Sequence, residues 1–195
     1  MNRAVFLDRD GVINETCLYQ GKPVTPSKVE EFRILPGVKE ALTALKRDGY
    51  YTFVVTNQPE IRRGTLTPEE LEKMHRLLSN TLPIDKIYVC MHDDQDRCEC
   101  RKPKPGMLLQ AAKEWSIDLT ASYMIGDRWK DMEAGAAAGC TTILVRSPWS
   151  AQQPSGRTVR GDYTVDSLIE AAKIILSRER RESNPGFPGS KAHGP

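Results

Sequence analysis

Two carboxylates stand two positions apart at the end of a short apolar run near the amino terminus. Asp8 and Asp10 follow the run Ala4-Val5-Phe6-Leu7, which has the composition of a buried strand. Neighbouring carboxylates repel each other unless a cation bridges them, and their oxygens are ligands that Mg²⁺ prefers. The pair therefore predicts a Mg²⁺-dependent reaction in which one carboxylate attacks the substrate and the other transfers a proton.

Three later segments bring more polar side chains, two of them at the ends of further apolar runs. Thr56-Asn57-Gln58 ends one run, Arg101-Lys102 supplies two cations, and Asp127 ends another run. The carboxyl ends of parallel strands meet at one edge of an open α/β sheet, so we expect these groups to lie together. A single aspartate after a strand more often stabilises a turn. The ordered set of four segments favours a catalytic site.

In this order the segments resemble the motifs of the haloacid dehalogenase superfamily of phosphohydrolases, from Asp8 to about Val145. Within that superfamily the chain is similar to the heptose bisphosphate and histidinol phosphate phosphatase branch. The motifs that carry the resemblance are Asp8-Arg9-Asp10-Gly11-Val12-Ile13-Asn14, Thr56-Asn57-Gln58, Cys100-Arg101-Lys102-Pro103-Lys104-Pro105-Gly106-Met107 and Gly126-Asp127-Arg128. The resemblance implies phosphate monoester hydrolysis through an aspartyl-phosphate intermediate.

The resemblance also implies a role for each catalytic residue. Asp8 attacks phosphorus, while Asp10 protonates the leaving alkoxide and later takes a proton from the hydrolytic water. Asp8, the backbone carbonyl of Asp10, and Asp127 would hold Mg²⁺. Thr56 and Lys102 would bind the remaining phosphoryl oxygens, where negative charge builds during transfer.

Further positions are implied to bind the substrate around this centre. The predicted substrate-binding residues are Arg9, Thr16, Cys17, Leu18, Tyr19, Asn57, Gln58, Pro59, Arg101 and Arg128. Arg101 would bind a phosphate that is not transferred. Arg128 stands where close relatives often carry lysine. The heptose enzymes commonly have Ser-Gly in place of Pro59-Glu60, so the chain departs from their pattern at a position that selects the substrate.

Three cysteines and a histidine lie close together just before Arg101. Cys90, His92, Cys98 and Cys100 form the pattern C-x-H-x5-C-x-C, which also occurs in the phosphatases that the chain resembles. Four such ligands complete the tetrahedral shell of a structural Zn²⁺ ion and leave no position for water. The alternative, buried thiols beside a histidine, needs a core that the polar turn at 93–97 does not offer. We predict a zinc-bound loop over residues 90–100 that orders the two cations after it.

Composition and charge narrow the remaining possibilities. The chain has 195 residues and a formal net charge of +2, which gives no reason to expect a nucleic acid or membrane partner. No stretch reaches the roughly 20 apolar residues of a membrane span, and the amino terminus enters a strand without a signal peptide. The five cysteines, an odd number, argue against a disulfide framework. We expect a cytoplasmic monomer that acts on a small phosphorylated metabolite.

Apolar periodicity predicts strands that alternate with helices. The expected strands cover 4–7, 51–55, 87–89, 122–125 and 141–145, and the expected helices lie between 36 and 49, after 67, and over 106–115, 132–138 and 166–177. This alternation is typical of an α/β fold with a doubly wound, mainly parallel sheet and helices on both faces. The gaps between the motifs are too short for a separate cap domain. We expect a phosphatase domain over 1–177 and a disordered tail over 178–195.

Several residues near the motifs have a structural interpretation. Leu71, Met74, Leu77 and Leu78 form the expected buried face of one helix, and Cys140 is expected to pack at the start of a strand. We expect His75, Lys104 and Lys130 at the surface. Asp131, one helical turn after Asp127, either supports the site or is solvated.

Three functions stay open at this point. The resemblance favours removal of the 7-phosphate from a heptose 1,7-bisphosphate, and the alternative is hydrolysis of histidinol phosphate or of another small sugar phosphate. A third possibility is a non-catalytic, zinc-stabilised module that binds phosphorylated metabolites. The intact set of Asp8, Asp10, Lys102 and Asp127 argues against that module, since a protein without catalysis has no need of the nucleophile.

Overall fold

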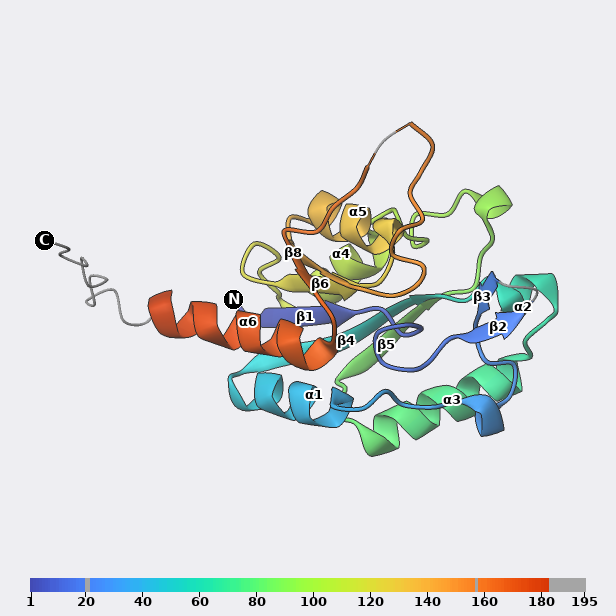
Figure 1. Cartoon of the computed structure of the whole chain (residues 1–195), viewed down its shortest axis with the longest axis horizontal. Coiled ribbons are helices and arrows are strands. Elements are labelled where there is room, and N and C mark those ends of the chain that lie inside the picture. The colour runs from blue at the N-terminus through green and yellow to red at the C-terminus, as the bar shows by residue number, and fades with distance from the viewer. Residues whose placement is uncertain (20–21, 157, 183–195) are drawn as a thin grey trace, which may run out of the picture.

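Six parallel strands form the central sheet of the protein (Figure 1). A computed structural model describes residues 1–19, 22–156 and 158–182. The strand order is β5-β4-β1-β6-β7-β8. The strands are β1 (Arg3–Leu7), β4 (Tyr50–Asn57), β5 (Lys86–Cys90), β6 (Tyr123–Gly126), β7 (Thr141–Val145) and β8 (Tyr163–Val165). The predicted fold class is confirmed.

Strand β1 lies in the middle of the sheet, and the chain leaves it in both directions. Leu7 pairs with Val54 of β4 on one side and with Ile125 of β6 on the other. On one side of β1 the chain forms β4 and then β5. It then crosses to the other side of β1, where it forms β6, β7 and β8 in turn. The order therefore reverses beside β1, and this is the place where open α/β sheets bind ligands at the carboxyl ends of their strands.

Helices cover both faces of the sheet (Figure 1). The helices α1 (Val38–Arg47), α3 (Pro68–Thr81) and α6 (Leu168–Glu182) bury apolar residues on one face, and α4 (Gly106–Trp115) and α5 (Trp129–Ala138) do so on the other. Strand β1 serves both cores because successive side chains of a strand point to opposite faces. Val5 and Leu7 join the first core, whereas Ala4 and Phe6 join the second.

Helix α3 begins where the sequence predicts, but its buried face is narrower. The Thr67 hydroxyl accepts a hydrogen bond from the Glu70 amide (3.2 Å), which caps the helix. The Glu70 carboxylate accepts from the Val29 amide (2.9 Å) and so ties the helix to a short 3-10 turn, η1 (Val29–Glu31). The prediction that Leu77 is buried is wrong, because the apolar stripe at 71, 74 and 78 leaves this side chain 37 % exposed.

The structure contains short elements that no periodicity could predict. They are the antiparallel hairpin β2 (Cys17–Tyr19) and β3 (Lys22–Val24), the one-turn helix α2 (Glu60–Arg63), the turn η2 (Asp94–Asp96), and β8. The described connections β1 to β4 and β4 to β5 contain the hairpin, η1 and the helices α1 to α3. No helix among the described residues is both long and apolar enough to cross a membrane.

The last helix extends past its predicted end. Helix α6 continues from the expected end at Ser177 to Glu182, so the predicted helix end is wrong, whereas the limits of the predicted domain stay predictions. The added segment, Arg178 to Glu182, contains only arginine and glutamate, which propagate a helix well although they give no apolar signal. The rest of the predicted tail, 183–195, lies outside the described residues.

Candidate active site

The carboxyl ends of the central strands surround a cavity of about 280 Å³. Asp8 directly follows β1, and its amide donates a hydrogen bond to the Ile125 carbonyl of β6 (2.9 Å). Of the predicted site residues, the cavity is lined by Asp8, Asp10, Thr16, Asn57, Pro59, Arg101, Lys102 and Arg128. The topology thus brings together four motifs that lie far apart in the sequence.

Lys102 is a buried cation between two carboxylates. Its Nζ lies 2.9 Å from Asp8 Oδ1 and 2.6 Å from Asp131 Oδ1, and its side chain is 2 % exposed. Asn57 fixes the backbone of Lys102, because its side chain donates to the Lys102 carbonyl (3.0 Å) and accepts from the Lys102 amide (3.1 Å). Burial lowers the pKa of Lys102, but Asp131 and Asp8 outweigh it and hold this pKa above its ordinary value. Lys102 is therefore charged at neutral pH.

Three carboxylates beside Lys102 could hold a metal ion. Oxygens of Asp8, Asp127 and Asp131 all lie within 4.8 Å of one another. Asp127 Oδ2 accepts a hydrogen bond from Ser147 Oγ (3.0 Å), and its buried Oδ1 has no hydrogen-bond partner among the described residues. Burial raises the pKa of Asp127 to about 7 and that of Asp8 to about 6. A divalent cation would offset the cost of ionising these groups, and their oxygens suit a hard ion.

Two glycines allow the backbone to come close to these carboxylates. Gly11 has a φ of 88°, and a Cβ there would lie 2.5 Å from Asp127 Oδ2. A Cβ at Gly126 would lie 2.1 Å from the Cβ of Asp131. Any larger residue at either position would push a carboxylate out of the cluster.

Asp10 is held by hydrogen bonds on both oxygens. It accepts from Arg9 Nη2 (2.9 Å), Gln58 Nε2 (2.8 Å), Asn14 Nδ2 (2.9 Å) and Thr25 Oγ1 (3.0 Å). Burial acts to raise the pKa of Asp10, but the Arg9 charge and these hydrogen bonds hold it below its ordinary value. Asp10 is thus ionised in the free protein, and an approaching phosphate dianion would favour its protonated form.

The structure places Arg9 and Gln58, both predicted to bind the substrate, next to Asp10. Both side chains are fully buried and lie outside the cavity lining. Arg9 also donates to Thr25 Oγ1 and to His75 Nε2 (3.4 Å). Burial and the nearby Arg9 lower the pKa of His75 to about 4, so it accepts this bond as a neutral ring. His75, expected at the surface, is partly exposed, and it supports the group that orients Asp10.

Other predicted residues lie behind or beside the cavity. Thr56 is buried, and its Oγ1 accepts a hydrogen bond from Gln58 Nε2 (2.9 Å). Cys17 is partly exposed in β2 and lies outside the cavity lining. Leu18 and Tyr19 also belong to β2, but their side chains are not among those described.

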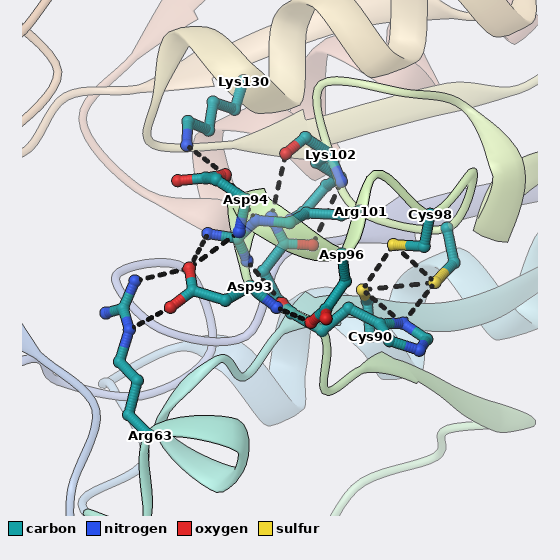
Figure 2. A network of polar contacts seen from close by, with 12 residues as sticks. Arg63, Cys90, Asp93, Asp94, Asp96, Cys98, Arg101, Lys102 and Lys130 are labelled. Atoms are coloured by element: carbon teal, nitrogen blue, oxygen red, sulfur yellow. Dashed lines mark hydrogen bonds and ion pairs between the residues drawn. The ribbon is translucent and has the colours of Figure 1, made fainter.

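The four predicted zinc ligands converge after β5 (Figure 2). The sulfur of Cys100 lies 3.2 Å from that of Cys90, 3.4 Å from that of Cys98 and 3.3 Å from His92 Nδ1. A tetrahedral ion with bonds of about 2.3 Å to sulfur places its ligand atoms about 3.8 Å apart, so a modest expansion would accommodate it. This segment, residues 90–100, is called the Cys/His loop below, and it could hold a metal ion.

The Cys/His loop contacts the cations of the cavity (Figure 2). Arg101 donates from Nε to Asp94 Oδ1 (2.7 Å) and from Nη1 to the His92 carbonyl (3.2 Å). Lys130 lines the cavity, with Nζ 3.9 Å from Asp94 Oδ1, so the expectation that it is a plain surface charge is wrong. Lys104 pairs with Glu99 (2.7 Å) and is 43 % exposed, as predicted for a surface residue.

Comparison with known proteins places the chain in a family. A family model described as "HAD-hyrolase-like" matches residues 99–171. The D-glycero-beta-D-manno-heptose-1,7-bisphosphate 7-phosphatase of Haemophilus influenzae is 36% identical over 193 residues, which cover 90% of this chain and 97% of that protein. The enzyme of the same name from Photorhabdus laumondii is 41% identical, with 88% and 94% covered. The chain belongs to the heptose bisphosphate phosphatase family of HAD-like hydrolases.

Solved structures agree with this membership. The D,D-heptose 1.7-bisphosphate phosphatase from B. bronchiseptica, complexed with magnesium and phosphate, has a TM-score of 0.78 and 29% identity, and covers 91% of this chain and 99% of its own. A putative HAD-like phosphatase from Mesorhizobium loti has a TM-score of 0.69 and 30% identity, with 89% and 87% covered. The family that the sequence motifs indicate is confirmed.

Four residues of the cavity were missed by sequence reasoning, and one was left undecided. The missed residues are Val24, Thr25, Arg63 and Asp94, and the undecided one is Asp131. For Asp131, the available signal was its spacing of one helical turn from Asp127. In the structure Asp131 pairs with Lys102 and therefore belongs to the site. The other four lie in the short hairpin, in α2 and in η2 or next to them, where no periodicity points toward the cavity.

Proposed function

We propose that this protein is a Mg²⁺-dependent phosphatase that removes the 7-phosphate from D-glycero-D-manno-heptose 1,7-bisphosphate. The arrangement of Lys102 between Asp8 and Asp131 carries the proposal, together with the neighbouring Asp127 Oδ1, which has no hydrogen bond among the described residues. It supplies a carboxylate nucleophile, a fixed cation and ligands for a hard metal in one cavity. The names of the relatives support the choice of substrate.

The residues divide the reaction into two steps. A carboxylate oxygen of Asp8 forms a bond to phosphorus while the bond to the sugar oxygen breaks, and Asp10 gives its proton to that oxygen. A water molecule then gives a proton to Asp10 and attacks phosphorus, which releases phosphate and restores the Asp8 carboxylate. The Lys102 ammonium stabilises the negative charge of the phosphoryl oxygens in both steps.

Mg²⁺ would be held by Asp8, Asp127 and the Asp10 carbonyl, with Asp131 beside them. When bound, it supplies positive charge to the phosphoryl group and screens the carboxylate nucleophile from it. Asp127 Oδ1, which has no hydrogen bond among the described residues, and the raised pKa values of Asp8 and Asp127 support this assignment.

Zn²⁺ is our proposal for the Cys/His loop. Three thiolates and an imidazole are the donors that structural zinc sites use, and four of them fill its coordination shell. The ion would therefore keep the loop ordered without taking part in the reaction. Arg101, which the loop holds at the cavity, would bind the phosphate that stays on the sugar.

Phosphate release tests the proposed function. We expect release from heptose 1,7-bisphosphate only with Mg²⁺, faster than from histidinol phosphate, and none from Asp8→Asn, because an amide is a poor nucleophile. A preference for histidinol phosphate would contradict the substrate, whereas binding without release would favour a non-catalytic module. Multiple turnovers by Asp8→Asn would contradict the nucleophile.

A further inference from the structure

Arg63 and Arg101 both line the cavity, and the carboxylate of Asp93 lies between them (Figure 2). Asp93 accepts two hydrogen bonds from Arg63, one from Nε at 2.6 Å and one from Nη2 at 2.7 Å. The oxygen that binds Arg63 Nη2 is also 3.8 Å from Arg101 Nη2. One carboxylate thus joins two guanidinium groups that come from different parts of the chain.

The two ends of this contact belong to separate elements. Arg63 is the last residue of α2, which follows β4, whereas Asp93 belongs to the Cys/His loop, which follows β5. A fork-shaped pair with two parallel hydrogen bonds fixes both distance and orientation, which a single contact does not. Arg63 therefore holds the Cys/His loop against α2.

Asp93 is itself rigid at this position. Its Oδ1 accepts a hydrogen bond from the Asp94 amide (2.8 Å), and its own amide donates to Asp96 Oδ2 (2.8 Å). Asp93 therefore forms a reciprocal capping box at the start of η2. Asp94, the next residue, binds Arg101 Nε. A shift of Asp93 would therefore move η2 and, with it, the hydrogen-bond acceptor of Arg101.

We propose that Arg63 is a positioning residue for substrate selection, which acts through Asp93 to hold Arg101 at the cavity. The pair of Arg63 and Asp93 is called the clasp below. This role deepens the proposed function and rests on it, because Arg101 is taken to bind the phosphate that is not transferred. With the clasp open, Arg101 keeps its charge but loses its fixed position. The substrate must then immobilise the Arg101 side chain when it binds, which weakens binding.

Arg62 provides a matched control for the clasp. It is the preceding arginine of α2 and also faces the Cys/His loop, but its Nε lies 3.7 Å from Asp96 Oδ1 and its side chain is 68 % exposed. Such an exposed and loose ion pair contributes little. Arg62→Ala removes the same charge from the same helix without opening the clasp.

Kinetics on two substrates test the proposal. We expect Arg63→Ala and Asp93→Asn each to raise the KM for heptose 1,7-bisphosphate by about three- to tenfold, in the range of a fork-shaped pair at a partly exposed site. The kcat and the hydrolysis of p-nitrophenyl phosphate, which has no second phosphate, should stay nearly unchanged. Arg62→Ala should match the wild type, and Arg63→Lys should recover only part of the loss, because lysine cannot form the fork.

The double variant separates positioning from direct contact. If Arg63 acts through Asp93, the combined change should cost no more than either single change. Additive losses, or an effect of Arg63→Ala that Asp93→Asn does not reproduce, would mean that Arg63 binds the substrate itself and would overturn the proposal. An equal loss on p-nitrophenyl phosphate would also overturn it.

Tryptic cleavage gives a readout that needs no substrate. Arg97 is exposed in the Cys/His loop, so an open clasp should speed cleavage after Arg97 in Arg63→Ala and not in Arg62→Ala, with the zinc content unchanged. Unchanged cleavage, or loss of zinc in Arg63→Ala, would overturn the clasp. If the wild type does not hydrolyse heptose bisphosphate but Arg63→Ala is still cleaved faster than Arg62→Ala, the proposed substrate is contradicted and the clasp is supported.

Discussion

Replacement of Lys102 by methionine should destabilise the fold in a pH-dependent way. Methionine has a similar shape and fits an apolar volume, but it removes the cation between Asp8 and Asp131. Loss of one partner from a buried ion pair costs about 3–5 kcal/mol near neutral pH, because the other charge is left without compensation. We expect a loss of that size in the free energy of unfolding of Lys102→Met, measured without added Mg²⁺.

The direction of the pH dependence follows from Asp8. Burial raises the pKa of Asp8 from 3.8 to about 6 even though Lys102 lowers it, so it must rise further without Lys102. When the pKa of a carboxyl is higher in the folded than in the unfolded protein, the free energy of unfolding falls as the pH rises between these two pKa values. In the wild type this fall in the free energy of unfolding ends near pH 6, whereas in Lys102→Met it continues to higher pH. The difference between them should grow above pH 6 by about 1.4 kcal/mol for each pH unit.

Urea unfolding at several pH values between about 5.5 and 7.5 would measure this difference within the window of the shifted pKa. Lys104→Met is the control, because it removes a lysine of the same segment whose side chain is 43 % exposed and pairs with Glu99 and the Arg97 carbonyl. Its stability should follow that of the wild type at every pH. A loss in Lys102→Met that is constant across the range would refute the coupling of Lys102 to Asp8.

Two further changes test the chemistry and the Cys/His loop. Asp10→Asn should lower kcat by about 10²–10⁴-fold, as expected for the loss of a general acid and base, and unchanged kinetics would move that role to another group. Zinc should co-purify at about one ion per chain, as a closed shell of four ligands requires, and Cys98→Ser should lower both zinc content and thermal stability. Metal analysis without zinc, after expression with zinc supplied, would contradict the second prediction.

The long elements and the strand ends could be predicted from the sequence because each has a strong local signal. Val38, Leu42 and Leu45 mark one helix by their spacing, and Gly49 marks its end. Each strand of the hairpin has three residues and α2 has four, which is too short for a repeating apolar pattern to stand out. Their conformation depends on tertiary contacts such as the one between Thr25 and Asp10. The cytoplasmic location, the monomeric state and the domain limits stay predictions.

The residues proposed to carry the chemistry have a stronger signal in the sequence than those that position them. Asp8, Asp10 and Asp127 have side chains that the proposed reaction needs, and each follows an apolar strand. The charge of Arg9 suggests contact with an anionic substrate, whereas the structure buries this residue as the partner of Asp10. A sequence shows the charge of a residue but not the direction in which the backbone points it.

The central place of β1 has a consequence for how the protein opens. Both edges of β1 are hydrogen-bonded, to β4 and to β6, and four of its five residues are buried. Its amides should therefore exchange with solvent only when the whole domain unfolds, whereas amides of the hairpin should exchange through local opening. The proposed nucleophile thus follows a strand whose backbone we expect to fluctuate little. Substrate preference could change through the loops without loosening the strand that carries Asp8.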